Sequence, residues 1–243
     1  MINMTKKIQI KERLIVALDV PSIEQAKDLV DTLGDAVVFY KIGLELFMSG
    51  EYFELLEWLN SKDKKIFVDL KFFDVPATVG RAVAQLNGKG VTFATIHGND
   101  SIMRAAAANK GDVQILAVTV LTSLDRGDLD DLGFDCDVQQ LVLSRAKRAI
   151  QLGCDGVVAS GHEAKAMREN LGHGFMVVTP GIRPIDNDDD QKRVVTPAQA
   201  FTNGADYIVV GRPIRDAPDP KRAAEKLQVE ITEIFDQKII AKV

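Results

Sequence analysis

Four charged side chains in apolar stretches of the sequence are the residues best suited to chemistry. Asp69, Lys71 and Asp74 belong to the run Asp-Leu-Lys-Phe-Phe-Asp, and Lys41 follows an earlier apolar run. Side chains two residues apart on a strand share a face, so we expect Asp69 and Lys71 to point the same way. Burying such charges is costly unless they are paired, and alternating signs offset that cost. The pattern indicates a catalytic network of paired charges.

A structural ion-pair network is the alternative interpretation, with Asp74 only capping the helix that runs through Pro76. Paired charges at strand ends perturb one another's pKa values whether or not they catalyse a reaction. We favour catalysis because four such groups are expected at one place.

Two later segments combine glycine with arginine in a way that suits an anionic ligand. One reads Thr-Pro-Gly-Ile-Arg-Pro and contains Gly181 and Arg183, and the other reads Val-Gly-Arg-Pro and contains Gly211 and Arg212. Glycine lets backbone N–H groups approach phosphate oxygens, and a guanidinium binds them bidentately. Ordinary turning of the chain explains each glycine equally well by itself. Two such pairs predict a phosphate site, with Arg212 as its strongest candidate.

An acidic run resembles the start of a calcium-binding loop at Asp186, Asp188 and Asp190. Gln191 replaces the glycine that such a loop needs, and Pro197 occupies the position of the bidentate glutamate. We therefore interpret the run as a solvated loop and predict no metal site.

The histidines are weaker candidates. His97 ends an apolar run and is a possible acid or base, although a lone histidine there is more often a hydrogen-bonded structural residue. His162 and His173 are expected at the surface beside helices. The sequence contains no Gly-x-Ser-x-Gly, His-Glu-x-x-His or phosphate-loop lysine motif.

The elements that must position these residues alternate regularly between strand and helix. The expected strands are eight short apolar runs at residues 14–19, 37–42, 65–70, 91–97, 113–121, 156–160, 175–179 and 207–210. Helical periodicity covers residues 23–33, 52–59, 75–86, 101–108, 138–152 and 163–171. Ser22 and Gln25 have the spacing of a capping box, and Thr196-Pro197 has the form of a helix start.

This alternation predicts one domain over residues 1–243, a single (β/α)8 barrel. Strands buried on both faces also suit a doubly wound open sheet, which is the competing fold. Eight units in 243 residues, and no Gly-x-Gly-x-x-Gly after the first strand, favour the barrel. Barrel active sites lie at the carboxyl ends of the strands, where the charged residues fall. The two glycine–arginine segments follow the seventh and eighth strands, where barrels often bind phosphate.

Composition narrows the class of protein further. The net charge of −5 argues against general affinity for nucleic acids. Cys136 and Cys154 match no zinc spacing or multi-bridge framework, which suits a cytoplasmic protein. The apolar run after the basic start is too short for a signal peptide, and no run is long enough to span a membrane. We expect a soluble protein.

Ordered motifs along essentially the whole sequence resemble the bacterial-type orotidine 5'-phosphate decarboxylase family. They are Leu-Asp-Val at 18–20, Lys-Ile-Gly at 41–43, Asp-x-Lys-x-x-Asp at 69–74, Leu-Thr-Ser at 121–123, Thr-Pro-Gly-Ile-Arg-Pro at 179–184 and Val-Gly-Arg-Pro-Ile at 210–214. Taken together, these motifs are highly specific.

The resemblance implies loss of CO2 from orotidine 5'-phosphate to give uridine 5'-phosphate, the last step of de novo pyrimidine nucleotide synthesis, without metal or organic cofactor. It makes Lys71 the proton donor within a network of Lys41, Asp69, Lys71 and Asp74. Substrate contacts are implied for Asp19, Lys41, Thr78, Thr122, Ser123, Arg183, Gln191, Gly211 and Arg212. The family forms homodimers, in which Asp74 and Thr78 would enter the neighbouring subunit's site. The acidic residues 188–190 beside Gln191 depart from the family's pattern.

Three other functions remain open. Magnesium-dependent sugar-phosphate decarboxylases and synthases share the barrel and the Asp-x-Lys-x-x-Asp run, but use an acidic residue near the position of Lys41, whose ammonium would repel a divalent cation. An aldolase that forms a Schiff base at Lys71 is more remote. A phosphate-ligand sensor without turnover is disfavoured by the intact set of charges.

Overall fold

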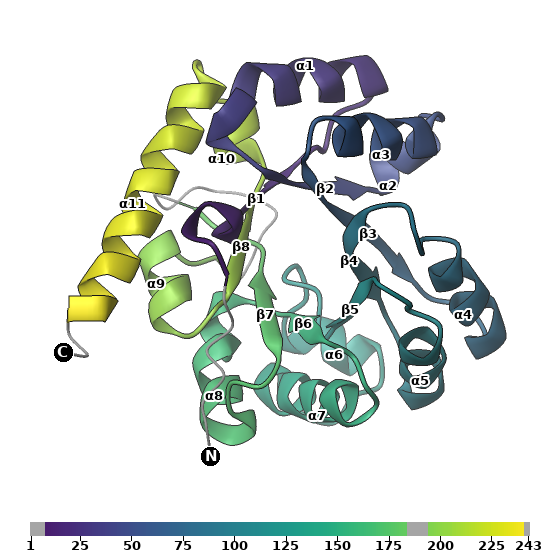
Figure 1. Ribbon diagram of the computed structural model, residues 1–243. Coiled ribbons are helices and arrows are strands. Elements are labelled where there is room, and N and C mark those ends of the chain that lie inside the picture. The colour runs from purple at the N-terminus through teal and green to yellow at the C-terminus, as the bar shows by residue number, and fades with distance from the viewer. Residues whose placement is uncertain (1–7, 184–193, 241–243) are drawn as a thin grey trace.

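Eight parallel strands close into a barrel in the structure, a computed structural model that describes residues 8–183 and 194–240. The strands are β1 (Leu14–Ala17), β2 (Phe39–Gly43), β3 (Lys65–Phe72), β4 (Val91–Ile96), β5 (Gln114–Val118), β6 (Gly156–Val158), β7 (Met176–Thr179) and β8 (Tyr207–Val210). Each strand pairs with the next in sequence, and β8 pairs with β1 (Figure 1). The predicted barrel is therefore confirmed, and the open sheet is excluded by the pairing of β1 with β8.

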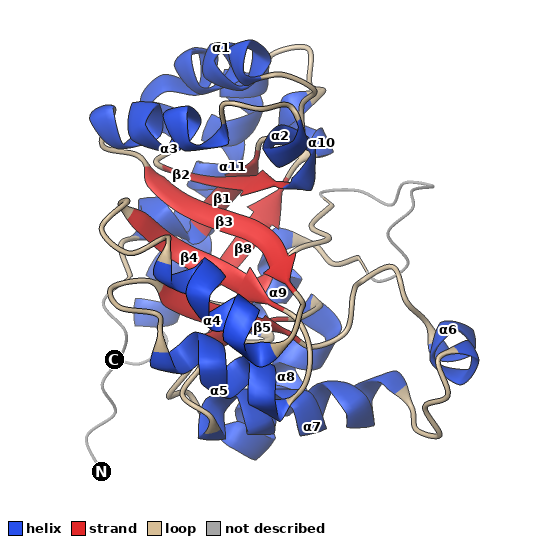
Figure 2. Ribbon diagram, turned by 90° about the vertical axis from the view of Figure 1, so that its right-hand side faces the viewer, coloured by secondary structure: helices blue, strands red, loops and turns tan. Residues whose placement is uncertain are grey.

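Helices surround the strands and cover their outer faces (Figures 1 and 2). The α-helices are α1 (Ile23–Leu33), α2 (Leu44–Met48), α3 (Tyr52–Ser61), α4 (Pro76–Ala84), α5 (Asp100–Ala108), α6 (Arg126–Asp131), α7 (Val138–Gln151), α8 (Gly161–Leu171), α9 (Pro197–Thr202), α10 (Arg212–Arg215) and α11 (Pro220–Ile240). Two 3-10 helices, η1 (Ile10–Arg13) and η2 (Gly34–Ala36), precede β1 and β2. The short helix α6 stands away from the barrel on the side to which the strands point (Figure 2).

Local sequence signals determine where several helices begin and end. The Ser22 side chain accepts a hydrogen bond from the backbone N–H of Gln25 at the start of α1. Thr196 and Gln199 form a reciprocal capping box at the start of α9. Gly34 ends α1 with a φ of 51°, a conformation that residues with a Cβ rarely adopt. These caps agree with the predicted helix boundaries.

Two apolar layers hold the barrel together. The inner cluster is Ile15, Ala17, Phe39, Phe67, Phe93, Leu116, Met176, Val178, Tyr207 and Val209. These residues alternate along their strands with others that belong to the larger cluster between sheet and helices. Both faces of each strand are therefore buried, which explains why the strands read as continuous apolar runs. The inner side chains nearest the carboxyl ends of the strands, such as Ala17, Phe67 and Val209, form an apolar floor at that end of the barrel.

The pairing of β3 with β4 shifts register twice, and the larger shift lies near the carboxyl end of β3. Val68 pairs with Ala94, and the next pair is Phe72 with Ile96, so three residues of β3 stand opposite Thr95 alone. A bulge of this kind redirects side chains locally and is common next to active sites. It lies in the run that contains Asp69 and Lys71.

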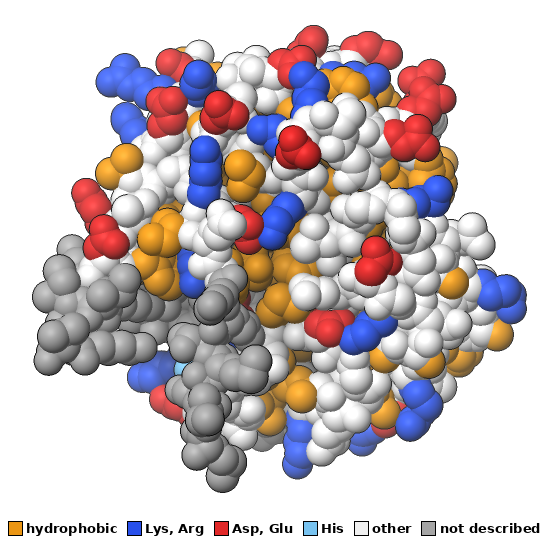
Figure 3. Space-filling view, in the orientation of Figure 1, with side chains coloured by type: hydrophobic (Ala, Val, Ile, Leu, Met, Phe, Trp, Pro, Cys, Tyr) orange, Lys and Arg blue, Asp and Glu red, His pale blue; other side chains and the backbone are white. Residues whose placement is uncertain are grey.

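Charges of both signs are interspersed on the face of the molecule shown in Figure 3. No helix among the described residues is long and apolar enough to cross a membrane.

Candidate active site

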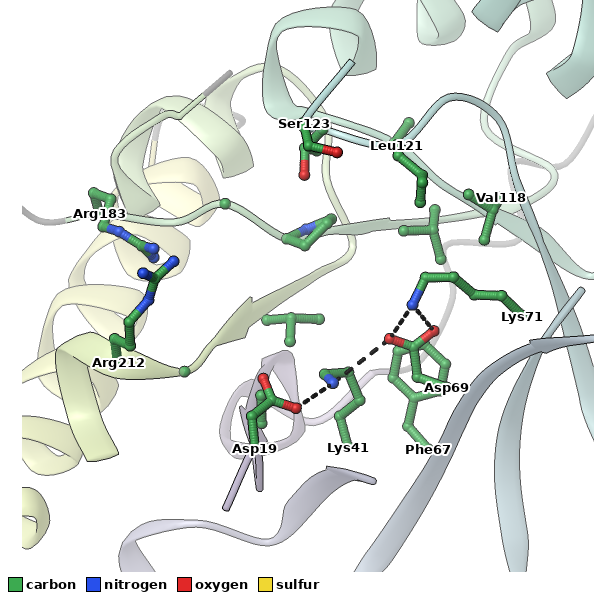
Figure 4. A pocket seen from close by; sticks show the side chains of 18 of the residues that line it. Asp19, Lys41, Phe67, Asp69, Lys71, Val118, Leu121, Ser123, Arg183 and Arg212 are labelled. Atoms are coloured by element: carbon green, nitrogen blue, oxygen red, sulfur yellow. Dashed lines mark hydrogen bonds and ion pairs between the residues drawn. The ribbon is translucent and has the colours of Figure 1, made fainter. Parts of the chain in front are cut away.

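A cavity of about 520 Å³ opens at the carboxyl ends of the strands, within the size range of small-molecule sites (Figure 4). Its floor is apolar and includes Ala17, Phe67, Val118, Val158 and Val209. Its polar lining residues are Asp19, Lys41, Asp69, Lys71, Thr122, Ser123, Arg183, Arg212 and Arg215, with Gly181 and Gly211. The structure thus brings together most of the residues that the sequence singled out.

Four charged side chains form a row of alternating sign across this cavity, here called the charged row (Asp19, Lys41, Asp69 and Lys71). The Nζ of Lys41 lies 2.9 Å from Oδ1 of Asp19 and 3.6 Å from Oδ2 of Asp69. The Nζ of Lys71 lies 3.0 Å from both carboxylate oxygens of Asp69. The row runs from Asp19, just after β1, through Lys41 on β2 to Asp69 and Lys71 on β3 (Figure 4).

Burial decides which charges in the row are accessible. The side chains of Lys41 and Asp69 are each 12% exposed, whereas that of Lys71 is 33% exposed and that of Asp19 is 45% exposed. Lys41 and Asp69, the two inner members of the row, are each paired with the charged residues on either side of them. Lys71, at the end of the row, presents its ammonium to the cavity. A ligand in the cavity therefore meets Lys71 as a cation fixed in place.

The charged row keeps its inner members ionised. Burial is the largest single influence on Lys41 and opposes its charge, but the carboxylates of Asp69 and Asp19 together outweigh it and raise the pKa of Lys41. Burial likewise opposes the charge of Asp69, but Lys41 and Lys71, with hydrogen bonds from Lys71 and Thr95, lower its pKa. Both groups therefore carry their charges at neutral pH.

A glycine beside the row leaves room for Lys41. A Cβ built on Gly43 would lie 3.3 Å from Nζ of Lys41 and 3.7 Å from Oδ1 of Asp19. A larger residue at the end of β2 would crowd the ammonium between its two carboxylates.

The anion-binding side of the cavity comes from the ends of β7 and β8. Arg183 is buried and Arg212 is exposed. Figure 4 shows their guanidinium groups facing one another at one end of the cavity, with Lys71 at the other end. Gly181 has a φ of 73°, a left-handed conformation that suits glycine, where the chain turns after β7. Two guanidinium groups at one end and an apolar floor in the middle suit a ligand with an anionic group and a flat, less polar body.

Thr122 and Ser123 line the cavity in the loop after β5. Thr122 is buried and Ser123 is exposed. In Figure 4, Ser123 lies on the opposite side of the cavity from the charged row.

Two predicted site residues that the structure describes are not among those that line the cavity. Asp74 is exposed and accepts a hydrogen bond from the backbone N–H of Val75 at 2.6 Å, just before α4. The Thr78 hydroxyl accepts from Arg81 at 3.3 Å on the same helix. Gln191 lies outside the described residues, together with the acidic residues 188–190.

His97, the weaker candidate acid or base, also lies off the lining of the cavity. Its ring packs edge-on against Phe73 with 5.6 Å between ring centroids. Burial, and then the positive charges of Arg145 and Lys71, lower its pKa. The imidazole is therefore neutral at pH 7.

Two polar residues of the site escaped the sequence analysis. Thr95 donates a hydrogen bond to Asp69 at 2.8 Å, and Arg215 donates to the backbone carbonyl of Asp19 while its guanidinium also binds Asp216. Thr95 was recognisable as a polar residue within an apolar strand, two positions before His97. Arg215 carried no comparable signal, because its role depends on where the end of β1 lies.

The described residues contain no group of three or more His, Cys, Asp or Glu side chains arranged to hold a metal ion. Between the carboxylates of Asp19 and Asp69, the positive charge is the Lys41 ammonium.

Comparison with known proteins identifies the same family that the sequence motifs resemble. Residues 12–227 match the family model described as orotidine 5'-phosphate decarboxylase / HUMPS family. A relative from Methylococcus capsulatus, named orotidine 5'-phosphate decarboxylase, is 66% identical over 95% of this chain and 96% of its own length. One of the same name from Stenotrophomonas maltophilia is 55% identical over 90% of this chain and 92% of its own length.

Solved structures agree with the sequence matches. The crystal structure of orotidine 5'-phosphate decarboxylase from Lactobacillus acidophilus superposes with a TM-score of 0.80 at 37% identity, over 90% of this chain and 99% of that one. The enzyme of the same name from Pyrococcus horikoshii superposes with a TM-score of 0.72 at 26% identity and the same coverage. With the sequence, the barrel and the relatives in agreement, this chain belongs to the orotidine 5'-phosphate decarboxylase / HUMPS family.

Proposed function

We propose that the cavity converts orotidine 5'-phosphate into uridine 5'-phosphate and CO2, with Lys71 as the proton donor and no metal ion. The decarboxylase activity itself follows from the family and from relatives of that name. The observation that carries the mechanism is the charged row, which holds the Lys71 ammonium against Asp69 at one end of a cavity whose other end carries two arginines.

The substrate is proposed to lie along the cavity with its phosphate at Arg183 and Arg212. Backbone N–H groups beside Gly211 and the side chain of Gln191 complete the phosphate site in this proposal. A guanidinium pair binds a phosphate dianion through parallel charge-assisted hydrogen bonds, which fixes its position. The phosphate then sets the distance at which the reacting ring meets Lys71.

The ribose and the pyrimidine are proposed to occupy the rest of the cavity. Asp19 and Lys41 hold the ribose hydroxyls together with Thr78 of the partner subunit, and Thr122 and Ser123 face the pyrimidine. The carboxylate of Asp19 is half exposed and its partner Lys41 is nearly buried but lines the cavity, so the pair offers an acceptor and a donor to neighbouring hydroxyls.

The chemical step breaks the bond between C6 of the pyrimidine and its carboxylate carbon. The electron pair of that bond stays on C6 as CO2 departs, and a proton moves from the Lys71 ammonium to C6. The neutral amine then regains a proton from water. The Lys71 ammonium stabilises the negative charge that develops at C6, because it lies where that charge appears and is fixed there before the reaction.

Preorganisation is the main source of rate in this proposal. Enzymes lower barriers by about 8 to 23 kcal/mol, and a metal-free decarboxylation through a carbanion needs the upper end of that range. The charged row supplies fixed charges within a partly buried site, where they act more strongly than in water. Repulsion between Asp69 and the departing carboxylate is an additional but smaller contribution.

The rival function is that of the magnesium-dependent sugar-phosphate decarboxylases and synthases, which share the barrel and the Asp-x-Lys-x-x-Asp run. The Lys41 ammonium lies between Asp19 and Asp69, 2.9 Å from the first carboxylate and 3.6 Å from the second. A divalent cation bound between the same two carboxylates would therefore have to lie close to this ammonium. Like charges so close repel strongly. This observation favours the metal-free reaction.

We further propose that residues 1–243 form one catalytic domain and that two copies associate as a homodimer. Asp74 and Thr78 would then complete the partner's site, which is consistent with their position outside this chain's own cavity lining. The large apolar side chains of Phe73 and Val75 are exposed on either side of Asp74, at 69% and 63%. The cytoplasmic location stays a prediction.

The decisive measurement follows the ultraviolet absorbance of orotidine 5'-phosphate with purified protein in excess chelator. We expect turnover in the wild type and loss by at least about 10³-fold in Lys71→Ala, because the general acid and the fixed cation are both removed. Lys110→Ala is the matched control, since Lys110 also pairs with an aspartate, Asp155 at 2.7 Å, but lies outside the cavity.

Two outcomes would overturn the proposal. Turnover that requires a divalent cation would favour the magnesium-dependent rival. A Lys71→Ala variant that is as fast as the Lys110→Ala control would remove Lys71 from the reaction.

A further inference from the structure

Lys71 has an unusual backbone conformation for a strand residue. Three non-glycine residues among those described have a positive φ: Glu51 at 52°, Asp63 at 54° and Lys71 at 47°. Glu51 and Asp63 lie in turns beside α3, whereas Lys71 lies within β3. Residues with a Cβ rarely adopt a positive φ, and this backbone conformation persists only where surrounding contacts stabilise it. The contacts of Lys71 therefore show what holds the residue in place.

The backbone N–H of Lys71 is bound by a side chain of the neighbouring strand. Between the pairs Val68–Ala94 and Phe72–Ile96, Thr95 stands alone opposite three residues of β3. The backbone N–H of Lys71 donates to Oγ1 of Thr95 at 2.9 Å. The main-chain ladder resumes at once, because the N–H of His97 donates to the carbonyl of Phe72 at 3.0 Å.

The same hydroxyl also orients Asp69. A threonine hydroxyl has one proton to donate, and that of Thr95 goes to Oδ1 of Asp69 at 2.8 Å. This carboxylate oxygen also accepts from Nζ of Lys71 at 3.0 Å. Thr95 is 0% exposed, so water has no access to replace either bond. One buried hydroxyl thus ties the backbone of Lys71 to the carboxylate that holds its ammonium.

We propose that Thr95 is a positioning residue for Lys71. Its hydroxyl holds the bulged backbone of β3 and the Asp69 carboxylate in a fixed relation, so that the Lys71 ammonium faces the cavity. Thr95 is not among the residues that line the cavity, so it acts through Lys71 and Asp69. The inference rests on the proposed function, in which Lys71 delivers the proton.

Thr95→Val and Thr95→Ser test this role. Valine has nearly the same shape but lacks the hydroxyl, whereas serine keeps the hydroxyl and loses only a methyl group. We expect Thr95→Val to lower kcat by about 10- to 100-fold with KM changed by less than about 3-fold, because a displaced proton donor affects the transition state more than binding. Thr95→Ser should restore kcat to within about 3-fold of the wild type.

Thr119→Val is the matched control for losing a buried hydroxyl. Thr119 is also 0% exposed, and its hydroxyl donates to the backbone carbonyl of Val158 at 3.0 Å rather than to a member of the charged row. We expect its kcat to stay within about 3-fold of the wild type. An equal loss of kcat in Thr119→Val and Thr95→Val would overturn the positioning role. It would mean that removing a buried hydroxyl elsewhere in the barrel lowers kcat as much as removing that of Thr95.

Hydrogen exchange of the Lys71 backbone amide gives a second readout that does not depend on activity. We expect protection in the wild type and in Thr95→Ser, and exchange at least about 10-fold faster in Thr95→Val, which leaves that N–H without its acceptor. Unchanged exchange in Thr95→Val would overturn the inference. Failure of the wild type to decarboxylate orotidine 5'-phosphate would instead overturn the proposed function, and the exchange rates would still decide what Thr95 holds.

Discussion

The ammonium of Lys71 lies 3.0 Å from both carboxylate oxygens of Asp69, although the backbone between the two residues leaves regular strand geometry. Asp69 is nearly buried and Lys71 is one-third exposed. Asp69 therefore holds the Lys71 ammonium from the protein side, and the ammonium is open to the cavity on its other side. A substrate that enters the cavity meets a cation whose position is already fixed, and no reorganisation is required when negative charge develops.

Removing the Asp69 charge should destabilise the fold. Asp69→Asn leaves the ammonium groups of Lys41 and Lys71 without their shared carboxylate, and we expect the free energy of unfolding at pH 7 to fall by on the order of 2 kcal/mol. Urea unfolding measures this difference. Asp31→Asn is the control, because Asp31 forms an exposed ion pair with Lys62 and should cost less than about 1 kcal/mol.

This stabilisation should depend on pH in one direction. The pKa of Asp69 in the folded state lies below its ordinary value, so its contribution is complete above the unfolded pKa of about 3.9 and is lost as the pH falls through the folded pKa. The difference between the wild type and Asp69→Asn should therefore stay constant from neutral pH down to about pH 5 and shrink below about pH 4. A difference that grew in acid would contradict the ion pairing.

Arg212→Ala should impair turnover as well as affinity. The phosphate is far from the reacting carbon, but its binding energy can organise the site, so we expect kcat/KM to fall by about 10³-fold with kcat and KM both affected. Steady-state kinetics of decarboxylation separates the two constants. Arg148→Ala, which removes an arginine from an exposed pair with Asp100, serves as the control. A rise in KM with kcat unchanged would show that the phosphate contributes to binding only.

Mixing two inactive variants tests the shared active site. If Asp74 completes the partner's site, a dimer of one Lys71→Ala subunit and one Asp74→Ala subunit contains one site with both residues intact. Random exchange makes half of the dimers mixed, so mixing equal amounts should restore about one quarter of wild-type activity.

The subunit test has an internal control. Lys71→Ala mixed with Asp69→Asn should stay inactive, because both residues come from the same subunit and no intact site can form. No recovery with Asp74→Ala, despite subunit exchange shown by tagged copies, would place Asp74 outside the neighbouring site.

Local sequence patterns were sufficient for the strands, several helix starts and the closed barrel. Apolar runs that are continuous, such as Leu14–Ala17, predict strands buried on both faces, and Ser22 and Thr196 cap their helices as expected. The ends of strands were less certain. The third strand was expected to end at residue 70, whereas β3 continues to Phe72 because the bulge opposite Thr95 lets the pairing with β4 resume.

The members of the charged row were identifiable from sequence as charged residues at the ends of apolar runs, and the barrel explains why they meet. Simple alternation along a strand also predicted that Asp69 and Lys71 share a side. The tertiary structure reaches this arrangement by another route, a left-handed residue whose backbone N–H is bound by Thr95 from the next strand. No pattern within the run 69–74 contains that information.

The sequence by itself determined the identity of the charges, their order and the fold that carries them, because these depend on residues close together in the chain. Only the tertiary structure decided which groups touch. Thr95 and Asp69 are 26 residues apart, and Arg215 reaches the carbonyl of Asp19 across 196 residues of sequence. Such contacts depend on the stagger of neighbouring strands around a closed barrel, and this stagger is set by the packing of all eight strands together.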